Sequence, residues 1–255
     1  MKLRISPALI VVAAGLALWE AAGLWSDLVR NVTGTPLTVG RELAAILSSS
    51  DIAFHFGVTA LELGAGLVLA IALGLILSLG LGTWDYTHRV IEPFLIVANT
   101  VPKVITLPAF LMLLGTGYAS KVAFGALHGM LPIAIIVSNG LRSVLANSQM
   151  QAAITMNATN GQLIRYILLP AVLPYLITAL RLSVSLTLLG VILGEMYVAR
   201  AGLGFLLMRW YGELQIPKML SVVFLIGSLA FVLDFVFRRI EAAVWRDHGI
   251  RTDNA

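Results

Sequence analysis

The stretch from Leu61 to Gly82, LELGAGLVLAIALGLILSLGLG, decides the fold. It holds a single charged side chain, Glu62, among leucine, alanine and glycine. A helix of about 20 apolar residues crosses a hydrocarbon core of roughly 30 Å, because each residue advances about 1.5 Å. The stretch therefore predicts a transmembrane helix, and its glycines let neighbouring helices approach closely.

Similar apolar stretches run through the whole chain. With the first they lie at about residues 7–25, 57–82, 90–115, 120–141, 171–198 and 217–237. Each should be helical, because lipid offers no partner to backbone N–H and C=O groups, and a β-barrel would show short alternating segments instead. The chain is 59% hydrophobic and 12% charged, whereas about 25% of the residues in a soluble domain are charged. The sequence predicts an all-α membrane protein with six transmembrane helices in one domain, residues 1–255. A signal peptide at the N-terminus is the alternative to a retained first helix.

The charged residues indicate which partners and sites to expect. The net charge of +4 comes from scattered basic residues, which favours lipid headgroups over nucleic acid as a partner. The basic tail from Arg238 to Arg251 places both termini in the cytoplasm. The chain has no cysteine, and His55, His88 and His128 show no metal-ligand spacing, so we expect no metal site.

Prolines interrupt the third apolar stretch. Pro102 and Pro108 flank Lys103 closely, and a proline removes a helical hydrogen bond and clashes with the preceding turn. The spacing predicts a kinked or broken helix within the membrane. Such a break lines a pathway or is a simple packing kink, and the sequence leaves both open.

Five charged residues fall within or near the ends of apolar stretches: Glu62, Lys103, Arg181, Glu195 and Asp234. A charge at the bilayer centre costs about 2.5–3.5 kcal/mol on insertion scales, so these side chains should face the bundle interior. Our first interpretation is structural ion pairs, for example Lys103 or Arg181 with Glu195 or Glu62. The alternative is a translocation pathway formed at Pro102, Lys103, Arg181 and Glu195, in which the two cations attract an anion and Glu195 shapes a gate.

The longest polar loop, residues 143–170, follows the fourth apolar stretch. Ser148 precedes Gln151 by three residues, and Thr159 precedes Gln162 by the same interval, so each pair can form a helix capping box. Asn157 between them can adopt the left-handed conformation that ends a helix. The loop is predicted to be a compact helix-turn-helix on the membrane surface.

This loop resembles the "EAA" loop of bacterial ABC-importer permeases, in which Glu-Ala-Ala precedes a glycine and later Ile-x-Leu-Pro. The matching residues here are Gln151, Ala152, Ala153, Asn157, Ile167, Leu169 and Pro170. Further along, Leu173-Pro174, Leu180-Arg181, Glu195 and Gly202-Leu203-Gly204 resemble the branch that serves nitrate, sulfonates, taurine and thiamine-precursor pyrimidines. Two positions depart from the pattern, because Gln151 replaces the glutamate and Asn157 the glycine. Both replacements preserve the shape of the loop.

The resemblance implies a six-helix permease fold in the bacterial inner membrane, with residues 143–170 as a coupling loop. It also implies two ABC ATPase subunits that bind ATP and Mg, a second permease copy, and an extracytoplasmic binding protein that delivers a small solute. The Gly202–Lys218 segment would then lie on the docking surface for that binding protein. The chain itself has no Gly-x-x-x-x-Gly-Lys-Ser/Thr phosphate loop, so we expect a transport subunit without its own ATPase site or cofactor.

Two other functions are compatible with a bundle of apolar helices. A secondary transporter driven by an ion gradient also uses broken helices and intramembrane carboxylates, but it gives the capped loop no special role. A membrane-embedded enzyme needs a clustered nucleophile, metal ligands or paired carboxylates, and no such set is evident in the sequence.

Overall fold

The computed structural model describes residues 7–26, 30 and 33–247, and the elements it assigns there are helical. In chain order they are α1 (Pro7–Trp25), α3 (Pro36–Ser48), α4 (Ser50–Thr83), α5 (Asp85–Thr100), the 3₁₀ turn η1 (Lys103–Thr106), α6 (Leu107–Leu114), α7 (Tyr118–Leu145), α8 (Ser148–Thr155), α9 (Asn160–Gln162), the π-helical turn η2 (Leu163–Leu168), α10 (Leu169–Val198), α11 (Leu203–Gly212) and α12 (Ile216–Asp247). The predicted all-α class is confirmed for the part of the chain that the structure describes.

Four helical segments are long and apolar enough to cross a membrane. They are α4, α7, the continuous segment 160–198 that ends in α10, and residues 216–243 of α12. A fifth span is present if α5 and the helical segment 103–114 count together, although they are bent by 96°. The apolar part of α1, residues 10–25, falls short of a full span. The structure therefore gives four or five spans in its described residues and does not confirm the predicted six.

The predicted break in the third apolar stretch is confirmed. Helix α5 ends at Thr100, and the chain resumes as η1 at Lys103 after Val101 and Pro102. Proline at position 102 has no N–H to donate, and it disfavours helical backbone at the residue before it. The change of direction at this point follows from that local chemistry.

Helix α3 was not predicted, because its 13 residues are too few and too polar to read as a span. Its N-terminus is nevertheless well defined. Thr35 and Thr38 form a reciprocal capping box, and Pro36 occupies the first helical position. A proline there has the right φ and lacks only an N–H that would have no helical partner.

Helices α4, α7 and α10 form the core of the bundle. Three glycines of α4 spaced eight residues apart, Gly66, Gly74 and Gly82, face α7. A Cβ at Gly74 would lie 2.7 Å from the Cβ of Ile133, so only a glycine allows this approach. The predicted close packing of this helix is confirmed at these three positions, whereas Gly64 meets open space.

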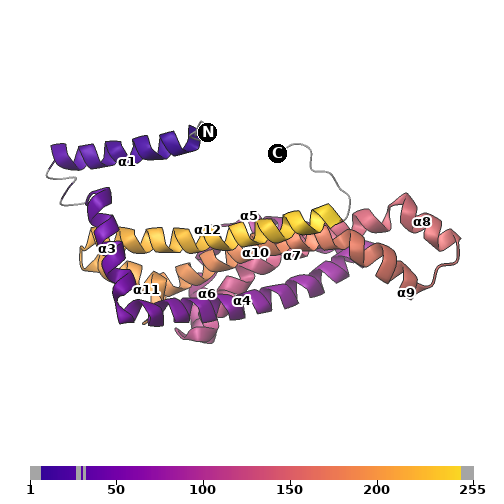
Figure 1. The fold of residues 1–255 in the computed structure, drawn as a ribbon. Helices are drawn as coiled ribbons and strands as arrows, with labels where there is room; N and C mark the ends of the chain where they lie inside the picture. The colour runs from indigo at the N-terminus through magenta and orange to yellow at the C-terminus, as the bar shows by residue number, and fades with distance from the viewer. Residues whose placement is uncertain (1–6, 27–29, 31–32, 248–255) are drawn as a thin grey trace, which may run out of the picture.

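The long helices run side by side along one axis (Figure 1). Helices α8 and α9 lie at one end, and α3 and α11 at the other, while α1 lies apart from the bundle. We call the first the α8 end and the second the α11 end. The loop that carries α8 and α9 is thus separated from α11 by the length of the bundle.

Candidate functional site

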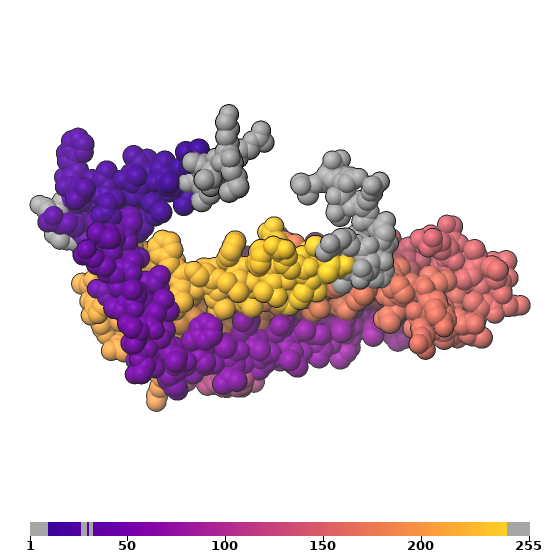
Figure 2. All heavy atoms as spheres, in the orientation of Figure 1, coloured from indigo at the N-terminus to yellow at the C-terminus, as the bar shows by residue number. Residues whose placement is uncertain are grey.

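The predicted coupling loop forms the tip of the α8 end (Figure 2). Met150 is 3% exposed and anchors α8, which packs against η2. Two residues further on, and therefore on the opposite side of the helix, Ala152 is exposed, while Ala153 is half-buried. Helix α8 therefore has an inner face, which holds it to the molecule, and an outer face of small residues open to a partner.

The turn that follows α8 has the predicted geometry. Asn157 has φ +59°, the left-handed conformation that asparagine tolerates better than most residues. The second capping box is also confirmed. The Thr159 backbone N–H donates to Gln162 Oε1 at 2.9 Å, and the Gln162 N–H donates to Thr159 Oγ1 at 3.4 Å.

The predicted Ser148–Gln151 capping box is wrong by one residue. Helix α8 already begins at Ser148, and its N-cap is Asn147, whose Oδ1 accepts from the Gln149 N–H at 3.3 Å. The extended backbone between α7 and α8 falls on Asn147, and only a residue with that backbone can cap the helix through its side chain. Gln151 Nε2 instead donates to the Leu145 carbonyl at 3.3 Å and so ties α8 back to α7.

The return arm of the loop carries the rest of the predicted motif. Ile167 and Pro170 are half-buried, and Leu169 is exposed at the start of α10. Large apolar side chains remain exposed over the whole tip: Ile154, Met156, Ile164, Tyr166 and Leu169. The α8 end thus offers an apolar surface on a rigid arm that continues into the membrane as α10.

The example ion pairs predicted inside the membrane are wrong, although structural pairing itself is present. Glu62 forms an ion pair with Lys121 of α7. Arg181 bonds to Asp234 Oδ1 at 2.9 Å and to Glu241 Oε2 at 2.8 Å, which joins α10 to α12. Pairing depends on which helices are neighbours, and helix periodicity within one sequence does not contain that information.

Glu195 lies at the centre of a buried hydrogen-bond network near the α11 end. Its side chain is 1% exposed, accepts from Thr59 Oγ1 at 2.7 Å through Oε1, and accepts from the Gly204 N–H at 2.7 Å through Oε2. The two preceding amides are also paired, because the Leu203 N–H donates to Thr59 Oγ1 at 2.9 Å and the Gly202 N–H to His55 Nδ1 at 3.0 Å. Side chains of α4 and α10 therefore satisfy the first amides of α11.

Sequence reasoning named Glu62 as an intramembrane charge but missed the roles of His55 and Thr59, which form the α4 side of this network. His55, Thr59 and Glu62 are spaced by four and three residues, which places them on one face of a helix. That spacing was the sequence signal that could have indicated a polar site on this face of the helix. Their partners, on α7, α10 and α11, could be identified only from the fold.

Lys103 lies at the break between α5 and η1. Its Nζ donates to the Asn99 carbonyl at 3.1 Å and to Asn99 Oδ1 at 3.3 Å. Within the described residues no carboxylate approaches this ammonium closely enough to form an ion pair. Unlike the cations of Arg181 and Lys121, this ammonium has no carboxylate partner within the described residues.

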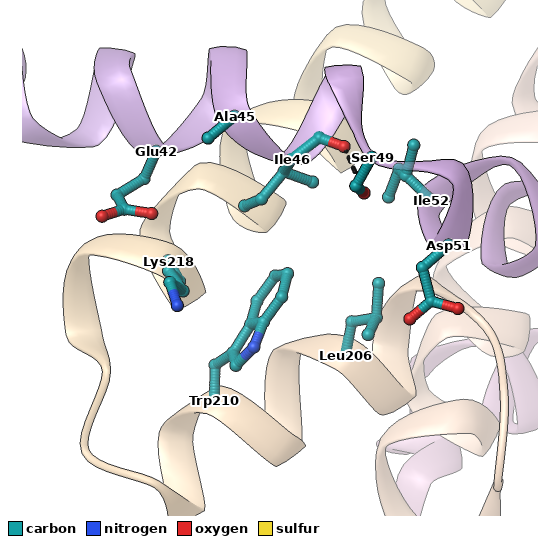
Figure 3. Close-up of a pocket in the computed structure, with 9 residues that line it drawn as sticks. All are labelled: Glu42, Ala45, Ile46, Ser49, Asp51, Ile52, Leu206, Trp210 and Lys218. Atoms are coloured by element: carbon teal, nitrogen blue, oxygen red, sulfur yellow. Dashed lines mark hydrogen bonds between the residues drawn. The ribbon is translucent and has the colours of Figure 1, made fainter.

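A cavity of about 260 Å³ opens at the α11 end (Figure 3). Trp210 of α11 stands in its wall, with Glu42 and Lys218 on one side and Asp51 on the other. These residues come from α3, α4, α11 and α12. The cavity therefore combines an aromatic wall with charges of both signs around its opening.

Together the transmembrane spans, the intramembrane charges and the exposed helical loop at the α8 end define a membrane transport protein of the permease class. The model of the family described as "Binding-protein-dependent transport system inner membrane component" matches residues 70–246. The chain belongs to this family, whose members are permease subunits of ABC importers for small solutes. This assignment favours the importer over an ion-gradient-driven secondary transporter.

The relatives agree with the assignment. The chain is 30% identical to the formylaminopyrimidine transport permease protein ThiX of Halalkalibacterium halodurans, over 91% of this chain and 92% of ThiX. It is 26% identical to the putative aliphatic sulfonates transport permease protein SsuC of Bacillus subtilis, over 97% of this chain and 88% of SsuC. A chain of the inward-facing MetNI methionine ABC transporter superposes with a TM-score of 0.53 at 21% identity, covering 74% of this chain and 91% of that one. The fold is thus that of an ABC transporter permease.

Proposed function

We propose that two copies of this chain form the membrane pathway of an importer, that two ABC ATPase subunits bind the α8 ends, and that both termini face the cytoplasm. ATP and Mg would be bound by the ATPase subunits, since this sequence has no phosphate loop. The large lipid-accessible surface supports a second copy, because only 11% of the most apolar part of α12 is buried within one chain. The branch that the sequence resembles supports a small polar or anionic solute.

The observation that carries the proposal is the outer face of α8. Ala152 is exposed between a cap that fixes the start of the helix and a left-handed turn that fixes its end. A short helix with small residues outward and a buried anchor inward can lie in a groove of another protein with little steric conflict. Motion of that partner would pass through η2 into α10, because the two are continuous.

Ala152→Asp tests the docking assignment. A charged side chain on the outer face of α8 should weaken ATPase binding by at least tenfold, because it would be desolvated in the interface without a partner. Ala153 is a less selective position, since it is half-buried and a charge there would also disturb the loop. Binding is measured by co-purification and by ATP hydrolysis of the complex in proteoliposomes.

Ala146→Asp is the matched control. Ala146 is exposed at the end of α7, just before α8, so the same change adds the same charge without altering the α8 face. It should leave ATPase binding within about twofold. Equal losses in the two variants would contradict docking on α8, and retained binding in Ala152→Asp would do the same.

The α11 end is proposed to receive the extracytoplasmic binding protein. The cavity of Figure 3 has a hydrophobic wall at Trp210, and the charges of Glu42 and Lys218 have no ion-pair partner among the described residues, which suits an apolar side chain flanked by charged contacts. Trp210→Ala should therefore lower binding-protein-stimulated ATP hydrolysis and leave the basal hydrolysis of the permease–ATPase complex unchanged. If the binding protein stimulated ATP hydrolysis of this variant as strongly as that of the unchanged protein, docking at the α11 end would be contradicted.

Of the four predicted pathway residues, we assign two to the pathway and two to the framework around it. Pro102 and Lys103 form the break in the third stretch and are taken up below. Arg181 is neutralised by two carboxylates and holds α12 against α10. Glu195 fixes the start of α11, and its contribution to a gate would be to keep that short helix closed over the bundle.

A further inference from the structure

Helix α5 has two chemically different sides. Its polar positions recur at helical spacing, at His88, Glu92 and Asn99, and Lys103, just beyond the end of α5, reaches back to this side by bonding to Asn99. The opposite side carries Val90, Phe94, Val97 and Val101. No residue of α5 is fully buried, but its polar side is turned towards the rest of the chain, since the side chains of His88 and Glu92 are only 16% and 27% exposed whereas Phe94 on the apolar side is 71% exposed. In a bilayer the apolar side suits lipid, and the polar side requires water or protein.

The charge of Lys103 is not neutralised within the described chain. Two of the three donors of its ammonium bond to Asn99, and neither bond removes the positive charge. The cation of Lys121, by comparison, is paired with Glu62, and that of Arg181 with Asp234. One donor and one full charge are therefore left for a ligand at Lys103.

With the α8 end at the cytoplasmic face, as proposed above, the break places this charge inside the membrane. Asp85, at the start of α5, bonds to Arg142 close to the α8 end, at 2.6 Å. Sixteen residues of α5 then carry the chain about 24 Å away from that end, which lies within a hydrocarbon core of roughly 30 Å. Irregular backbone at such a depth is tolerated where it lines a water-filled cavity or is covered by protein.

We propose that the polar side of α5 lines the translocation pathway and that Lys103 and Asn99 form a site for an anionic group, such as a sulfonate or carboxylate, of the transported solute. This inference rests on the importer function proposed above. The ammonium supplies the attraction, and the Asn99 amide supplies a further donor in reach of the same oxygen atoms. A solute with no negative charge could accept hydrogen bonds here but would gain no charge attraction from this site.

A cysteine reporter tests the site without knowledge of the solute. The chain contains no native cysteine, so Ile96→Cys, three residues before Asn99 on the polar side of α5, is the single thiol. In membrane vesicles of the permease–ATPase complex, the ratio of its rate with anionic sulfonatoethyl methanethiosulfonate to its rate with cationic trimethylammonioethyl methanethiosulfonate should exceed the ratio for a free thiol in solution. Adding Lys103→Gln should lower the anion-to-cation rate ratio by about tenfold, because one nearby unit charge affects the two reagents in opposite senses.

Two controls separate the site from general accessibility. Val97→Cys, on the apolar side of α5 and 61% exposed, should react with neither reagent because it faces lipid. Lys103→Arg keeps the charge and should keep the rate ratio. An Ile96→Cys thiol that reacts with neither reagent, or a ratio unchanged by Lys103→Gln, overturns the inference. Since ATPase docking is measured separately at Ala152, either failure can occur without the other.

Discussion

At the scale of single residues, Glu195 shows what a buried carboxylate does besides binding solute. Replacing it with alanine leaves the Gly204 N–H without an acceptor in a site that water does not reach. We expect Glu195→Ala to lower the free energy of unfolding by about 2–4 kcal/mol, because an unpaired buried N–H costs about 1–3 kcal/mol and the emptied volume adds to it. Thermal unfolding of the purified complex in detergent measures the loss.

Glu213→Ala is the control for that measurement. Glu213 pairs with Arg209 one turn away at 3.0 Å, and both side chains are exposed, so its removal should cost at most about 1 kcal/mol. Equal losses of unfolding free energy at positions 195 and 213 would show that the buried hydrogen bonds of Glu195 stabilise the fold no more than an exposed ion pair does.

The sequence identified Glu195 as an unusual charge but not its role. Its main partners are a backbone amide nine residues ahead and a hydroxyl on α4, 136 residues earlier. Local patterns reach the length of a cap or a turn, which is why Asn157 and the Thr159 box were predicted correctly. Contacts between distant helices, such as the Lys121–Glu62 pair, depend on the packing of the whole bundle.

At the scale of helices, the glycines of α4 decide how closely α7 can pack. Gly74→Ala would place a Cβ 2.7 Å from the Cβ of Ile133 and 3.0 Å from the Met130 carbonyl oxygen, both of which are held by helix α7. We expect a loss of about 1–3 kcal/mol in stability, typical of overpacking. The loss is measured as a lower midpoint of thermal unfolding.

Gly64→Ala on the same helix is the matched control. A Cβ at Gly64 meets nothing within 4 Å, so alanine should be neutral or raise stability by up to about 1 kcal/mol through its better helix propensity. A glycine-rich span was readable from the sequence, but which glycines face a neighbour was not. Helix α3 was also missed because it is too short and polar to read as a span, and the span count depends on the bend after α5 and the short apolar part of α1.

At the scale of the whole molecule, the functional assignment needs the α8 and α11 ends to lie on opposite sides of the membrane. Met156 at the α8 end is 83% exposed, and Leu214 between α11 and α12 is 81% exposed. Because the chain has no native cysteine, Met156→Cys and Leu214→Cys each give a single reporter thiol. A membrane-impermeant maleimide should label Met156→Cys in inside-out vesicles and Leu214→Cys in intact spheroplasts.

The proposed coupling between ATP hydrolysis at the α8 end and the binding protein at the α11 end requires this labelling pattern. In the proposed importer ATP is hydrolysed in the cytoplasm and the binding protein acts outside it, so a continuous element must connect the two compartments. The continuous helix from Asn160 to Val198 is such an element, with the capped loop at one end and Glu195 near the other. Labelling of both thiols from the same side, or with the sides exchanged, would leave the ATPase and the binding protein without access to their proposed surfaces.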